Sequence, residues 1–83
     1  MKKVLRFTAS WCNPCKQLAP IIESIETTVP IEVVDVDTDE GSQLATKYGI
    51  RGVPSLVMVE NGFATKSITG LRTKEQLTSW IND

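Results

Sequence analysis

The residues with the clearest chemistry are two cysteines, Cys12 and Cys15, which are separated only by Asn13 and Pro14. They follow a short β-branched and aromatic stretch at Val4–Thr8 and precede an amphipathic pattern, which places them at the start of a helix. Backbone N–H groups and the positive end of the helix dipole favour a thiolate there. A thiolate attacks disulfides, so the spacing predicts reversible dithiol–disulfide chemistry.

The positions of the two cysteines along this helix predict different roles for them. Cys12 lies at the helix start, and Cys15 lies one turn further in and should be less exposed. We expect Cys12 to attack and form a mixed disulfide, and Cys15 to resolve it by attacking Cys12. Lys16, four residues after Cys12, adds a modest positive field.

Two other uses of the pair are open at this point. Two such chains could together supply four thiolates to zinc or to an iron–sulfur cluster. A purely structural disulfide is less favoured, because it would close a very short loop and constrain the unfolded chain little. No metal site is predicted within one chain, which has 2 cysteines and 0 histidines.

A cluster of acidic residues superficially resembles a calcium-binding loop; it comprises Asp35, Asp37, Asp39 and Glu40. Its glycine comes one place later than a calcium loop requires, so we interpret these side chains as solvated.

The remaining segments alternate between strand and helix patterns that must position the cysteines. Strands are expected at Val4–Thr8, Ile31–Asp37, Ser55–Glu60 and Phe63–Ile68. The second strand should be buried on both faces at its centre. Helices are expected from Pro14 to about Thr27, with a kink at Pro20, then at Ser42–Tyr48, and after a Thr73–Gln76 capping box.

The order of these segments predicts an α/β fold, β-α-β-α-β-β-α. The first two strands should be parallel because a helix joins them, and Asn61-Gly62 is a hairpin signal that makes the last two antiparallel. A four-stranded mixed sheet of order 2-1-3-4, flanked by three helices, fits this pattern. With 83 residues, the chain is expected to form a single domain, 1–83.

Composition excludes several classes of partner. The formal net charge is −1, which provides no basic surface for nucleic acid or anionic membranes. No apolar run approaches the roughly 20 residues of a membrane span, and Met1–Arg6 is too short an apolar stretch for a signal peptide. We expect a cytoplasmic monomer (in the host cytoplasm if the protein is viral).

Two motifs resemble those of the thioredoxin family. Trp11–Lys16 is similar to its active-site motif, with Asn13 where the commonest member has glycine. Lys47–Ser55 is similar to its second signature, which ends in a cis-proline, and Gly70 falls at a matching place. The resemblance covers nearly the whole chain and implies a thioredoxin-like fold.

The resemblance also implies a substrate groove. Val53–Pro54 would be cis and would face the cysteines, leaving the backbone of Val53 free to pair with an extended substrate segment. Trp11 would be partly exposed as a flat contact surface. Gly70 would let a substrate chain approach a further wall of the groove, or would equally be only the turn before the last helix.

The chain departs from the family pattern in three places. It resembles a minimal, glutaredoxin-sized member without the usual amino-terminal strand and helix. Arg6 stands at the position of the family's buried acid, and Val33 stands where a lysine usually pairs with that acid. An inward Arg6 would stabilise a Cys15 thiolate, but a side chain that reaches out to solvent is the favoured interpretation.

The function that the resemblance implies is a protein-disulfide reductase whose only redox group is the Cys12–Cys15 pair, with no cofactor. Its partners would be disulfide-containing client proteins and an electron donor, either a thioredoxin reductase or glutathione. One alternative is a disulfide oxidant or isomerase, which often has a histidine between the cysteines. The other is a dimeric metal or iron–sulfur carrier, against which Pro14 argues.

Overall fold

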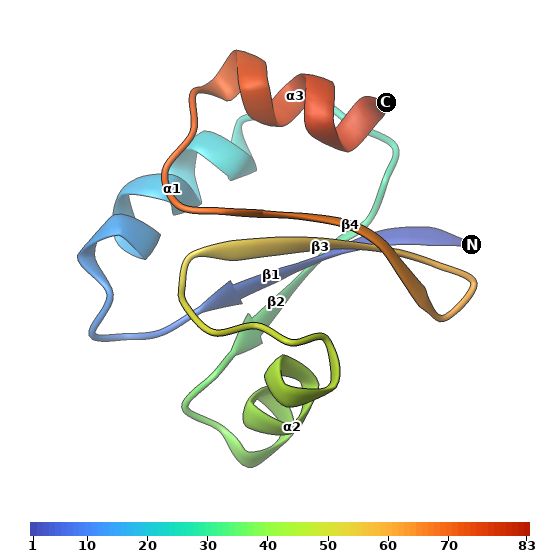
Figure 1. Ribbon diagram of the computed structural model, residues 1–83. Helices are drawn as coiled ribbons and strands as arrows, with labels where there is room; N and C mark the ends of the chain where they lie inside the picture. Colours follow the sequence, from blue (N-terminus) through green and yellow to red (C-terminus); the bar gives the residue numbers. More distant parts are fainter.

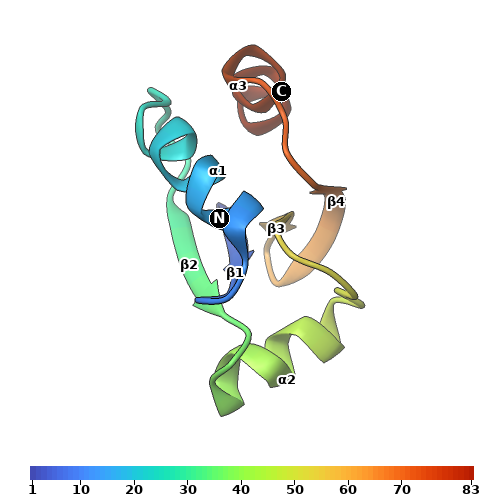
Figure 2. The ribbon, with the colours of Figure 1, turned by 90° about the vertical axis from the view of Figure 1, so that its left-hand side faces the viewer.

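The computed structural model describes residues 1–83 and has three helices and four strands (Figure 1). The sheet order is β2-β1-β3-β4, with β1 and β2 parallel and the other neighbours antiparallel. Helices α1 and α3 cover one face of the sheet and α2 covers the other (Figure 2). The predicted fold and strand order are therefore confirmed. In chain order the elements are β1 (Lys2–Thr8), α1 (Asn13–Glu23), β2 (Ile31–Asp35), α2 (Asp39–Lys47), β3 (Ser55–Glu60), β4 (Phe63–Thr69) and α3 (Lys74–Asn82).

Side chains of the inner strand β1 alternate between two hydrophobic layers, as the pleat of a strand requires. Val4 packs into the layer under α1 and α3, which includes Leu18 and Ile81. Leu5 and Phe7 pack into the layer on the α2 side. Because Arg6 lies between Leu5 and Phe7 on the strand, its side chain shares the α1 face with Val4.

Helix α1 begins at the cysteine motif and ends sooner than its apolar spacing predicts. It continues past Pro20 but stops at Glu23 rather than near Thr27. The Ser24 hydroxyl donates to the Ile21 carbonyl at 2.7 Å, so it satisfies one of the last carbonyls of the helix. Ile25 still reaches the core, which explains why the apolar pattern runs beyond the helix.

Helix α2 begins at Asp39, three residues before the predicted start at Ser42. The Thr38 hydroxyl accepts the Gly41 N–H at 3.0 Å, and Asp39 lies in the first turn, where its charge suits the helix dipole. The helix ends as predicted with Gly49, whose φ of 68° is the left-handed conformation expected after a helix C-terminus. No helix in the structure is both long enough and apolar enough to cross a membrane.

Strand β2 differs from its prediction in length and in burial. It ends at Asp35, and only Val34 on it is buried, whereas Val33 is 56% exposed. The expectation of a centre buried on both faces is wrong because β2 is an edge strand whose α1-side face is left uncovered at Val33.

The carboxyl-terminal half follows its sequence signals closely. Asn61 and Gly62 both have positive φ, 53° and 88°, as the two-residue hairpin turn between β3 and β4 requires. Thr73 and Gln76 form both hydrogen bonds of the predicted capping box, at 3.1 and 3.0 Å. This cap fixes the start of α3, which places Leu77 and Ile81 in the core.

Candidate active site

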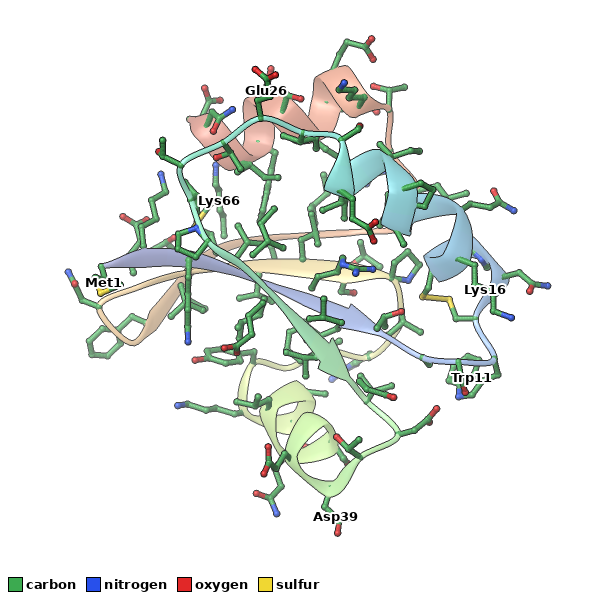
Figure 3. All side chains as sticks on the ribbon, turned by 180° about the vertical axis from the view of Figure 1, so that it is seen from behind. Met1, Trp11, Lys16, Glu26, Asp39 and Lys66 are labelled. Carbon is green, nitrogen blue, oxygen red and sulfur yellow. A yellow bond between two sulfur atoms is a disulfide. The ribbon has the colours of Figure 1, made fainter.

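The two cysteines form a disulfide at the start of α1, with their Cα atoms 5.3 Å apart. Cys12 is the N-cap residue, and its sulfur accepts the backbone N–H of Cys15 at 3.2 Å. Figure 3 shows the disulfide as a yellow bond beside Lys16 and near Trp11. The N–H and the positive helix end therefore both act on the Cys12 sulfur.

Burial distinguishes the two cysteines only slightly in the disulfide form. Cys15 is 2% exposed and Cys12 is 4% exposed. Both pack with Ala9, and Val36 and Val53 close the cluster from the side. Three other residues of the predicted site are exposed around the pair: Asn13, Pro14 and Lys16.

Trp11 is 67% exposed, and its ring is held by a hydrogen bond that local sequence pattern does not predict. Its indole Nε1 donates to Asp37 Oδ1 at 3.1 Å. The prediction that the acidic cluster is merely solvated is wrong for Asp37, because the parallel strands β1 and β2 bring the residues that follow them to the same edge of the sheet. The Val36 N–H donates to the Thr8 carbonyl at 3.0 Å, which continues the pairing of β1 with β2 beyond the strands. The predicted parallel pairing of these two strands is therefore the sequence feature that indicates the contact between Trp11 and Asp37.

A shallow apolar cavity of about 160 Å³ lies beside Trp11. The loop before β3 forms its opposite wall. Five of its seven lining residues are hydrophobic, so it suits an apolar side chain of a partner. The lining comprises Trp11, Val36, Ala45, Ile50, Arg51, Gly52 and Val53.

The loop that bears Pro54 contacts the cysteines, and its backbone is partly unused. The Val53–Pro54 peptide bond is cis. The Pro54 carbonyl accepts the Gly70 N–H at 2.9 Å, so the loop that bears Pro54 is joined to the turn at Gly70. Neither the N–H nor the C=O of Val53 makes a hydrogen bond within the protein. Val53 therefore presents a free donor and a free acceptor next to the disulfide.

Arg6 is buried, with only 8% of its surface exposed. Its Nε is buried, whereas the two terminal nitrogens are not and lie in an open hollow, so the side chain is mostly buried and meets solvent only at its tip. β1 is an inner strand of the sheet, so Arg6 lies between Val33 on β2 and Leu56 on β3. It lines a second cavity together with Cys15.

The redox-active group of the site is the disulfide itself. The structure has no cluster of three or more His, Cys, Asp or Glu side chains that could hold a metal ion.

Comparison with known proteins gives a consistent result. A family model described as thioredoxin matches residues 1–83. A thioredoxin of Rickettsia bellii is 38% identical over 79 residues, which cover 93% of this chain and 75% of that protein. A thioredoxin of Bacillus subtilis is 33% identical over 78 residues, which cover 92% and 75% respectively. Among solved structures, a mutant thioredoxin of Halobacterium salinarum aligns with a TM-score of 0.87 at 35% identity, over 96% of this chain and 71% of that one.

The fold, the Cys12–Cys15 disulfide and these matches define a thiol–disulfide oxidoreductase of the protein-disulfide reductase class. The chain belongs to the thioredoxin family. Membership implies client proteins that contain disulfides, and a reductase partner, in general terms. The oxidant or isomerase and the dimeric metal carrier are not favoured by these matches.

Proposed function

We propose that Cys12 is the attacking nucleophile of this reductase and Cys15 the resolving thiol. The observation that carries the assignment is the N-cap position of Cys12, whose sulfur accepts the Cys15 N–H at 3.2 Å. After reduction the same N–H and the helix dipole would stabilise a Cys12 thiolate. Cys15 lies inside the first turn and is the more buried of the two.

The reaction then has two steps that balance atoms and electrons. The Cys12 thiolate attacks one sulfur of a client disulfide, and the other client sulfur leaves as a thiolate that takes a proton from water. The Cys15 thiolate next attacks Cys12, which forms the Cys12–Cys15 disulfide and expels the second client sulfur. The client gains two electrons and the pair loses two.

The client is expected to bind as an extended segment over Val53 and Trp11. The free N–H and C=O of Val53 can pair with the backbone of such a segment, in the manner of a short added strand. The exposed Trp11 ring and the apolar cavity beside it can receive one client side chain. The Gly70 N–H donates to the Pro54 carbonyl, so Gly70 lies beside the loop over which the client segment would bind.

Replacing Trp11 by alanine tests this docking surface. A Trp11→Ala variant is expected to raise KM for a protein disulfide about tenfold, because an aromatic contact worth about 1.4 kcal/mol is lost. The rate with a small aromatic disulfide should change less than about twofold, since that substrate needs little docking. Steady-state kinetics with both substrates would measure the difference.

Phe63→Ala is the matched control for the loss of an exposed aromatic ring. Phe63 is 75% exposed and directly follows the hairpin turn at Asn61. The Asn61 N–H donates to the Met1 carbonyl, and Figure 3 shows Met1 and Trp11 at opposite ends of the molecule, so Phe63 lies far from the docking surface. Its KM should equal that of the wild type. Equal KM values for all three proteins would exclude Trp11 as a client contact.

The electron donor, the cellular compartment and the assembly state complete the proposal. We propose that residues 1–83 act as a single-domain monomer in the cytoplasm, with either a flavoprotein thioredoxin reductase or glutathione as donor. In the step that regenerates the dithiol, the Cys12–Cys15 disulfide takes two electrons from the dithiol of the reductase or from two glutathione thiols, so the proposal gives this chain no further cofactor. Reduction of the oxidised protein by NADPH with a thioredoxin reductase, compared with reduction by glutathione, distinguishes the donors.

A further inference from the structure

Arg6 is a buried cation without a protein partner. Its side chain makes no hydrogen bond, and its Nε is buried with no acceptor. The single ion pair in the protein joins Lys3 and Glu32. Because no protein group accepts from the guanidinium, water that reaches its two terminal nitrogens must solvate the charge.

The cavity next to Arg6 connects it to the resolving cysteine. This cavity has a volume of about 300 Å³ and is lined by Arg6 and Cys15, with the hydroxyl-bearing Thr8 and Ser10 among the other residues. The cavity is open to solvent and large enough for water, which can therefore enter and solvate the guanidinium. Arg6 and Cys15 thus line the same open hollow of the surface.

Two further charged side chains line the cavity, Lys16 from α1 and Asp35 from β2. Both are exposed, so solvent and salt screen their fields. Asp35 is also engaged, because its Oδ1 accepts the Asp37 N–H at 2.9 Å. On β3 the residue opposite Arg6 is the apolar Leu56. Arg6 is therefore the least exposed of the three charged residues that line the cavity with Cys15.

We propose that Arg6 stabilises the Cys15 thiolate in the resolving step. The inference rests on the proposed function, in which Cys15 displaces the client from Cys12. Burial disfavours the thiolate of a cysteine that is 2% exposed, and a nearby positive charge offsets that penalty. The Cys15 proton passes to water in the cavity, the thiolate bonds to Cys12, and the client sulfur leaves with the electron pair and takes a proton from water.

Reaction of the reduced protein with the chromogenic disulfide dithiobis(nitrobenzoate) separates the two steps. Attack by Cys12 releases one thionitrobenzoate, and resolution by Cys15 releases a second, so stopped-flow absorbance resolves two phases. In Arg6→Gln and Arg6→Met the second phase is expected to be about tenfold slower near neutral pH, with the midpoint of its rate–pH profile about one unit higher. The first phase should change less than about twofold.

Control variants separate the charge from a structural effect of the side chain. Arg6→Lys retains the positive charge and should restore most of the second-phase rate. Asp35→Asn removes the exposed negative charge of the same cavity and should not slow that phase. Arg6→Met removes an unpaired buried charge, so it should fold with at least wild-type stability, which thermal unfolding would verify.

Three results would overturn the inference. The first is an unchanged second-phase rate in both Arg6→Gln and Arg6→Met. The second is a second-phase rate in Arg6→Lys as low as in these two variants. The third is a second-phase rate that falls in Asp35→Asn and not in the Arg6 variants. Failure of the proposed function looks different, because the first phase would then be missing or would depend on Cys15.

Discussion

Replacing Cys15 by serine is expected to stop the reaction at the covalent adduct between Cys12 and the client. Without the neighbouring thiol, only an external thiol can release the client, and turnover should fall at least about a hundredfold because the effective concentration of the Cys15 thiol is lost. Intact-mass measurement of the reduced variant mixed with a protein disulfide should reveal a one-to-one adduct that dithiothreitol cleaves.

Cys12→Ser is the control for the assignment of roles. It should form no adduct above background, and it should lose at least about a thousandfold in activity, as removal of a nucleophile does. A stable adduct on Cys15 in this variant would contradict the proposed roles of the two cysteines. The wild type should accumulate no adduct, because Cys15 resolves it.

The second large effect concerns stability and arises at Gly41. A Cβ atom added there would lie 1.8 Å from the carbonyl oxygen of Asp35, which is far inside van der Waals contact. That oxygen belongs to the backbone, so no side-chain rotation can relieve the clash. Gly41→Ala should therefore cost at least about 3 kcal/mol of unfolding free energy and lower Tm by more than about 12 °C.

Gly52→Ala is the matched control for this prediction. A Cβ atom at Gly52 meets nothing within 4 Å, and its φ lies outside the left-handed region. Its Tm should stay within a few degrees of the wild type, since changes at such positions cost within about 0.5 kcal/mol. Equal unfolding free energies for the two variants, measured by urea denaturation, would mean that α2 does not pack on the end of β2 as described.

The sequence predicts the part of the site that depends on local pattern. The spacing of Cys12 and Cys15, with Pro14 between them, suffices to place a disulfide at a helix start. The same holds for the hairpin turn at Asn61, where two residues determine the conformation, and for the capping box at Thr73, where four do. These features need no knowledge of which elements lie side by side.

The features that sequence reasoning missed all depend on neighbours that are distant in the chain. The predicted strand order places Arg6 between β2 and β3, but how much of its side chain is buried depends on the side chains packed around it, which the order alone does not give. Asp37 bonds to Trp11 only because two parallel strands end at the same edge. Val33 is exposed because no helix covers that part of β2, although its β-branched neighbours resemble a buried strand.

The most direct test of the account is catalysed reduction of a protein disulfide. Insulin should be reduced by dithiothreitol much faster in the presence of catalytic amounts of the protein, with the oxidised Cys12–Cys15 pair recovered when the reductant is exhausted. The acceleration should vanish in Cys12→Ser. A rate equal to that of dithiothreitol alone, or full acceleration by Cys12→Ser, would contradict the assignment of this chain as a reductase that acts through Cys12.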